Sequence, residues 1–137
     1  MGRILLVEDE AATRLTVART LRGAGHVVEV AEDGRECLDL YRATSADVVI
    51  MDLYMPNKDG LETLIELRRE FPQVAVVAMS GHRKLELMLR AAKGLGAVRT
   101  IEKPFEPEAL LALVAEELDW VRASLEARTR THQQGSA

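Results

Sequence analysis

Five short apolar runs recur along the chain at broadly even spacing, and segments with helical periodicity separate them. Several runs are rich in β-branched residues and almost continuously apolar, which is typical of strands buried on both faces. The runs are Ile4–Val7, Val27–Val30, Val48–Met51, Val74–Met79 and Ala97–Ile101. Their alternation with helices predicts an α/β fold, a doubly wound five-stranded parallel sheet with helices on both faces.

The segments between and after the runs predict five helices. The second spans about 34–43, the third begins near Gly60 and ends before Pro72, the fourth spans about 84–93, and the last begins at Pro107. Helical spacing predicts inward-facing positions in the first three helices. These are Leu15, Ala18 and Leu21, then Cys37, Leu38 and Tyr41, then Leu61, Leu64, Ile65 and Leu67.

Length and composition fit one domain of an ordinary globular protein. The chain has 137 residues, which we divide into a domain at 1–118 and, at 119–137, an extension of the last helix with a polar tail that frays from Thr129. The net charge of −4 gives no reason to expect nucleic-acid binding, and no apolar run is long enough to span a membrane. A single cysteine, Cys37, and no secretory signal favour the cytoplasm.

Polar residues follow four of the apolar runs at the point where each strand is expected to end. Glu8 and Asp9 follow the first run, Asp52 the third, Ser80 the fourth and Lys103 the fifth. Sheets of this kind bind ligands beyond the carboxyl ends of their strands. Clustered carboxylates need a cation, and oxygen ligands favour Mg²⁺. With a lysine and a hydroxyl, this set predicts phosphoryl transfer onto an aspartate.

Five motifs match one known family in order and spacing, from residue 3 to about residue 118. They are Ile4–Glu10 (ILLVEDE), Val48–Pro56 (VVIMDLYMP), Asp59-Gly60, Met79–Gly81 (MSG) and Glu102–Phe105 (EKPF). Together they resemble the response-regulator receiver domain of bacterial two-component signalling, in its single-domain, chemotaxis-regulator-like form. The resemblance implies a flavodoxin-like strand order of 2-1-3-4-5.

The resemblance also implies a phosphoacceptor and a metal site. Asp52 is expected to accept the phosphoryl group and to contact Mg²⁺. Asp9 is expected to hold the ion directly and Glu8 to help through water. Tyr54 is expected to contribute its backbone carbonyl to the metal.

Three further expectations concern the phosphoryl group. By the same resemblance, Ser80 bonds a phosphoryl oxygen, Lys103 pairs with the phosphoryl group, and the Lys103-Pro104 bond is cis. The family usually has an aromatic residue three positions before this lysine, but Thr100 stands there in this chain. We therefore expect the readout of phosphorylation to differ from the usual coupling between a hydroxyl and an aromatic ring.

The function implied is that of a phosphoaccepting receiver, which assists its own modification and is not a conventional enzyme. Its phosphodonor is a sensor histidine kinase or histidine phosphotransfer protein, and its output is a downstream protein target. A pseudo-receiver that binds without phosphorylation is the alternative. A redox protein of flavodoxin type is disfavoured because Glu8, Asp9 and Glu10 would repel the cofactor phosphate, and no substrate pocket for a hydrolase is evident.

Two segments predict protein contacts. The basic triplet His82-Arg83-Lys84 predicts a surface for an acidic partner. In the last helix, apolar residues step by three and four, which indicates either a homodimer contact or signalling linker, or a helix whose first half packs on the sheet while the rest frays. These residues are Leu111, Val114, Leu118, Val121 and Leu125. The sequence leaves open whether the chain is a whole protein or one domain of a longer one.

Overall fold

The structure, a computed structural model, describes residues 1–55, 60–81 and 98–135. The strands are β1 (Arg3–Val7), β2 (Val27–Ala31), β3 (Val48–Asp52), β4 (Val76–Ser80) and β5 (Val98–Glu102). The helices are α1 (Ala11–Gly23), α2 (Gly34–Thr44), α3 (Gly60–Glu70) and α5 (Pro107–Gly135). The helix predicted at about 84–93 and the basic triplet at 82–84 lie outside the described residues.

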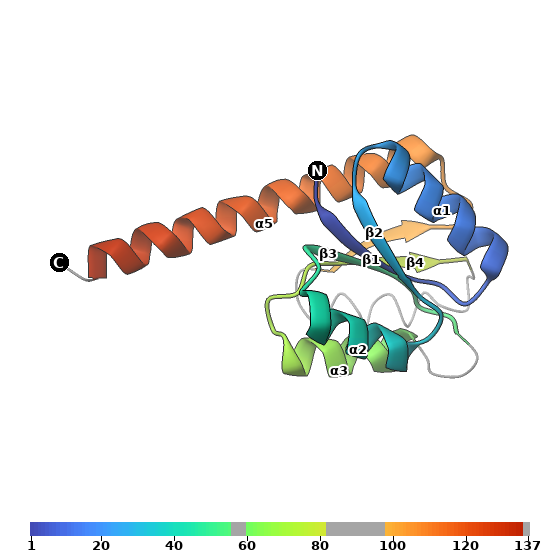
Figure 1. The fold of residues 1–137 in the computed structure, drawn as a ribbon, viewed down its shortest axis with the longest axis horizontal. Coiled ribbons are helices and arrows are strands. Elements are labelled where there is room, and N and C mark those ends of the chain that lie inside the picture. The colour runs from blue at the N-terminus through green and yellow to red at the C-terminus, as the bar shows by residue number, and fades with distance from the viewer. Residues whose placement is uncertain (56–59, 82–97, 136–137) are drawn as a thin grey trace.

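The five strands form one parallel sheet in the order β2-β1-β3-β4-β5, which confirms the predicted fold (Figure 1). The two strands that carry the acidic residues, β1 and β3, are neighbours at the centre, with Val7 opposite Met51. Strand order reverses at β1, because the chain moves outward to β2 and then back across to β3. The carboxyl ends of β1 and β3 therefore lie at the position where such folds bind ligands.

Alternating side chains of the strands build a separate core on each face of the sheet. Leu5, Val49 and Val76 face α2 and α3, where Tyr41 of α2 packs edge-on against Phe71 with ring centroids 4.7 Å apart. The opposite face packs against α1 and α5. Its core residues include Ile4, Leu6, Val17, Leu21, Ile50, Leu110 and Val114. A sheet covered on both faces holds its strand ends rigidly.

One local prediction was wrong. Leu15 does not face the core: it is 50% exposed, and the buried residues of α1 are Val17, Ala18 and Leu21. Helix α5 runs to Gly135, and fraying of the tail from Thr129 stays a prediction. The last helix thus leaves the domain as one straight projection (Figure 1).

Candidate functional site

Three carboxylates meet at the carboxyl ends of β1 and β3. Glu8 and Asp9 follow β1, Asp52 ends β3, and one ligand oxygen from each lies within 4.8 Å of the others. The sequence prediction that these residues converge is therefore confirmed in geometry. Three oxygen donors this close repel one another unless a cation or proton joins them.

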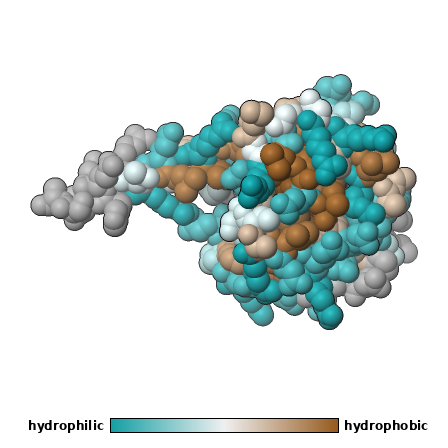
Figure 2. Space-filling view, viewed as in Figure 1, coloured by the Kyte–Doolittle hydropathy of each residue, from teal (hydrophilic) through white to brown (hydrophobic). Residues whose placement is uncertain are grey.

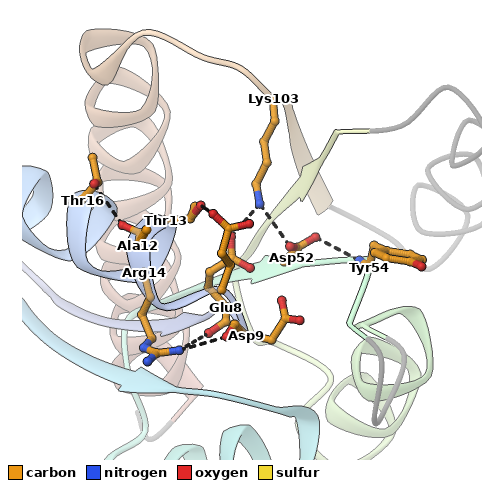
Figure 3. Close-up of polar contacts among 10 residues, drawn as sticks. Glu8, Asp9, Ala12, Thr13, Arg14, Thr16, Asp52, Tyr54 and Lys103 are labelled. Atoms are coloured by element: carbon orange, nitrogen blue, oxygen red, sulfur yellow. Dashed lines mark hydrogen bonds and ion pairs between the residues drawn. The ribbon is translucent and has the colours of Figure 1, made fainter.

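Lys103 reaches the same cluster from the end of β5 (Figure 3). Its Nζ lies 2.6 Å from Oε1 of Glu8 and 3.1 Å from Oδ2 of Asp52. Burial lowers the pKa of Lys103, but the hydrogen bond to Glu8 and the charge on Asp52 outweigh that effect and raise the pKa above its usual value. The lysine is therefore a permanent cation that bridges two carboxylates.

Glu8 is the most buried of the three carboxylate residues, with its side chain 1% exposed. Burial, together with contact with Asp52, raises the pKa of Glu8 to about 7, although Lys103 opposes the shift. Among the described residues, its second oxygen, Oε2, has no hydrogen-bond partner. A buried carboxylate oxygen without a partner is costly, and a bound cation would satisfy it. The donor set of this site, three carboxylates and no nitrogen or sulfur, fits Mg²⁺.

Asp52 is held from the loop that follows it. Its Oδ1 accepts a hydrogen bond from the backbone N–H of Tyr54 at 2.9 Å, which leaves Oδ2 facing Lys103. Behind it, a Cβ on Gly60 would lie 2.2 Å from the carbonyl oxygen of Asp52 and 2.6 Å from Cα of Leu53. Only glycine permits α3 to begin this close to the strand end.

The remaining predicted residues lie where the sequence analysis expected them. Ser80 ends β4 and is 2% exposed, and its carbonyl accepts the N–H of Lys103 at 2.6 Å. The Lys103-Pro104 bond is cis, as expected. Thr100 lies on β5 opposite Ala78 and is partly exposed. The metal contact predicted for the Tyr54 carbonyl stays a prediction; the Tyr54 side chain is 63% exposed.

Arg14 is a residue of the site that the sequence analysis missed. Its Nη1 donates to the carbonyl oxygens of Glu8 at 3.0 Å and Asp9 at 3.3 Å (Figure 3). The available signal was weak: a basic residue in the helix directly after the acidic loop. Its partners are backbone atoms, which have no sequence signature.

Comparison with known proteins gives the family. A model of the response regulator receiver domain matches residues 4–115. Response regulator MprA of Mycolicibacterium vanbaalenii is 37% identical over 110 residues, which cover 80% of this chain and 47% of that protein. DNA-binding transcriptional regulator NtrC of Escherichia coli K12 is 32% identical over 113 residues, 82% of this chain and 24% of that protein.

Solved structures of related proteins have the same fold as this chain. NtrX from Brucella abortus, in complex with ATP, superposes with a TM-score of 0.85 at 30% identity, covering 93% of this chain and 29% of that one. Chemotaxis protein CheY4 of Vibrio cholerae gives a TM-score of 0.79 at 32% identity, covering 86% of this chain and 99% of that one. This chain belongs to the response-regulator receiver domain family of two-component systems.

Family membership brings general properties. Receiver domains typically bind Mg²⁺, are phosphorylated by histidine kinases and are generally not conventional enzymes. The chain spans between about a quarter and just over half the length of the first curated relatives that it matches. Within the residues that the structure describes, none of the helices has both the length and the apolar character that a bilayer span requires.

Proposed function

We propose that this chain is an active phosphoreceiver in which Asp52 accepts a phosphoryl group from a phosphohistidine donor. One observation carries the proposal: Glu8, Asp9 and Asp52 converge within 4.8 Å, and Lys103 contacts two of them. A pseudo-receiver that binds without phosphorylation has no need for a buried carboxylate oxygen without a partner or for a lysine aimed at Asp52.

The proposed chemistry uses the charges already in place. A carboxylate oxygen of Asp52 attacks the phosphorus, the phosphorus–nitrogen bond breaks, and its electron pair stays with the imidazole, which takes a proton. Glu8, Asp9 and Asp52 would hold Mg²⁺, which would supply positive charge to offset that of the phosphoryl oxygens. Lys103 shifts from the carboxylates to a phosphoryl oxygen, and the Ser80 hydroxyl donates to another. Water later hydrolyses the aspartyl phosphate.

Acetyl phosphate with MgCl₂ tests this proposal, with intact-protein mass as the readout. The wild type is expected to gain the mass of one phosphoryl group, and Asp52→Asn is expected to gain none. Asp47→Asn is the matched control, because Asp47 is an exposed aspartate at the opposite edge of the sheet. A wild type without mass gain, or a gain that survives Asp52→Asn, would contradict the proposal.

A groove beside Lys103 supports a protein donor as the phosphoryl source. It has a volume of about 520 Å³ and runs between α1, at Thr16 and Val17, and the segment of Lys103, Pro104 and Phe105. The groove leads to the lysine that contacts Asp52 and is apolar along much of its wall, as protein interfaces are at their centre. Thr16→Arg is expected to slow transfer from a phosphohistidine protein while acetyl phosphate still reacts; equal slowing of both reactions would contradict this assignment.

We also propose that the projecting part of α5 pairs with a second copy. Hydrophobic side chains gather on the helix where it leaves the domain (Figure 2), and Leu125 is 54% exposed. Leu118, Val121 and Leu125 step by three and four along one side of the helix, which is the spacing of a two-helix seam. Sedimentation should show a dimer that Leu125→Glu weakens and Ala123→Glu, on the opposite side of the helix, does not. A monomeric wild type, phosphorylated or not, would contradict the pairing.

A further inference from the structure

Arg14 connects helix α1 to the acidic loop that follows β1. Its guanidinium donates to the carbonyl oxygens of Glu8 and Asp9, at 3.0 and 3.3 Å, and its Nη2 lies 3.4 Å from a carboxylate oxygen of Glu32. The Arg14 side chain is only 18% exposed, while that of Glu32 is 66% exposed. The contacts with the two carbonyls are therefore the better shielded part of this arrangement.

The loop that Arg14 contacts has few other restraints. The N–H of Glu8 still donates to the carbonyl of Ala31 at 3.0 Å, in continuation of the β1–β2 ladder. Beyond that point the chain turns away from the sheet. The side chain of Glu10, at the N-cap of α1, accepts from the Thr13 hydroxyl at 2.7 Å but does not cap a backbone N–H of the helix. Arg14 thus fixes two successive peptide groups between the end of the ladder and the start of the helix.

The two cations of the site differ in the atoms that they contact. Lys103 contacts carboxylate oxygens of Glu8 and Asp52, which are the atoms that a metal ion would use. Arg14 contacts Glu8 and Asp9 through their backbone carbonyls, so it leaves their carboxylates available (Figure 3). A lysine in contact with the ligands competes with a divalent cation, whereas an arginine behind them can hold them in place.

We infer that Arg14 is a positioning residue for the divalent cation: it fixes the backbone of Glu8 and Asp9 so that their carboxylates face Asp52 before the ion arrives. The inference rests on the proposed function only in so far as the cation binds at these carboxylates. Residues that orient metal ligands contribute substantially to affinity although they do not touch the metal.

The direction in which Mg²⁺ affinity changes on removal of Arg14 distinguishes a positioning role from an effect of its charge alone. Removing a positive charge near the site makes its potential more negative, which by itself would tighten Mg²⁺ binding. Loss of a restraint on two ligands weakens binding, because the ion must then order the loop itself. The inference therefore requires weaker binding despite the lost cation, which a charge effect alone cannot produce.

The experiment measures Mg²⁺ affinity from the rise in thermal unfolding midpoint over a MgCl₂ series at constant ionic strength. Arg14→Met, which keeps length and removes all donors, is expected to raise the dissociation constant about tenfold. Arg22→Met is the matched control: Arg22 lies on the same helix and donates to the carbonyl of Val28 at 2.8 Å, away from the acidic loop. It is expected to stay within about twofold of the wild type.

Arg14→Lys keeps the experiment decisive if Arg14→Met does not fold. Lysine retains the charge but lacks the planar fork, so an intermediate loss of affinity is expected. Unchanged or tighter Mg²⁺ binding in the Arg14 variants, or an equal loss in Arg22→Met, would overturn the inference. Failure of this kind leaves the proposed function intact as long as Asp52 is phosphorylated, and the acetyl phosphate experiment decides that separately.

Discussion

At the amino-terminal edge of the sheet, Asp47 and Arg3 exchange two hydrogen bonds of 2.8 Å, one from each backbone N–H. Nearby, the N–H of Gly2 donates to Nδ1 of His26 at 3.1 Å. At the carboxyl-terminal edge of the same sheet, three carboxylates are crowded together and the buried Oε2 of Glu8 has no partner among the described residues. The polar groups named at the amino-terminal edge are hydrogen-bonded to one another. At the carboxyl-terminal edge, the Oε2 of Glu8 has no such partner among the described residues.

The contrast indicates that the amino-terminal edge contributes to the stability of the fold, whereas the carboxyl-terminal edge carries the chemistry. Buried like charges destabilise a folded protein, and they persist where a ligand uses them. Substitutions at the carboxyl-terminal edge should therefore change chemistry strongly and, where they remove charge repulsion, improve stability. Substitutions at the amino-terminal edge should reduce stability and leave the chemistry unchanged.

The largest effect is expected from Lys103→Met. The rate of phosphorylation by acetyl phosphate should fall about 100-fold, because the charge that stabilises the transferring group is lost. Mg²⁺ should bind at least about tenfold more tightly, because the internal cation that contacts Glu8 and Asp52 is gone. The rate of phosphorylation is measured by following the intact-protein mass over time. Lys103→Arg, which keeps the positive charge, is the comparison variant. Weaker Mg²⁺ binding in Lys103→Met would contradict the competition between lysine and metal.

Glu8→Gln should change the pH dependence of stability. The pKa of Glu8 is raised from 4.5 to about 7, so the folded state holds a proton that the unfolded state releases. The resulting stabilisation is complete below pH 4.5 and is lost as the pH rises through about 7. Without divalent cations, wild type should lose on the order of 2 kcal/mol relative to Glu8→Gln between these limits.

Urea unfolding in EDTA, repeated at several pH values, measures this difference. A difference between the two proteins that stays constant with pH would rule out Glu8 as the titrating group. Since a metal-bound carboxylate must be deprotonated, Mg²⁺ affinity of the wild type should rise with pH over the same range. Glu8→Gln should lack most of that rise.

The smallest effect is expected from Asp47→Ala at the opposite edge. Loss of the side-chain bond to the N–H of Arg3 should lower the free energy of unfolding by about 0.5 to 1 kcal/mol. Phosphorylation of Asp52 should proceed at the wild-type rate, because the substitution lies at the other end of β3. Urea unfolding and the mass assay check the two statements, and a slowed phosphorylation would show that the two edges are coupled.

The sequence predicts most of the fold because five apolar runs alternate with amphipathic segments. It also predicts that Glu8, Asp52 and Lys103 converge, because parallel strands bring their carboxyl ends to one edge. The face of α1 was less well determined: apolar residues at positions 15, 17, 18 and 21 fit two overlapping faces. Only packing against the sheet and α5 shows that Val17 is buried and Leu15 is exposed.

Other features depend on contacts that residue types do not encode. Arg14 contacts backbone carbonyls, which every residue has, so only its place in the helix after the acidic loop points to it. Burial of Glu8 depends on how closely α1 and the Lys103 segment cover the end of β1. The helical end of α5 depends on propagation of backbone hydrogen bonds from a helix already fixed on the domain, and polar composition alone does not prevent this.

Helix α5 has 29 residues and is therefore about 43 Å long. Val121 still packs against the core and Arg122 donates to the carbonyl of Met1, so the projecting part begins after Arg122 and measures about 20 Å. A rigid rod of that length is a lever: a tilt of about 5° at the sheet would displace its far end by about 2 Å, by simple geometry on the same rise per residue. A rearrangement too small to alter the packing of the domain can therefore displace the end of α5 by a distance that changes its contacts with another protein.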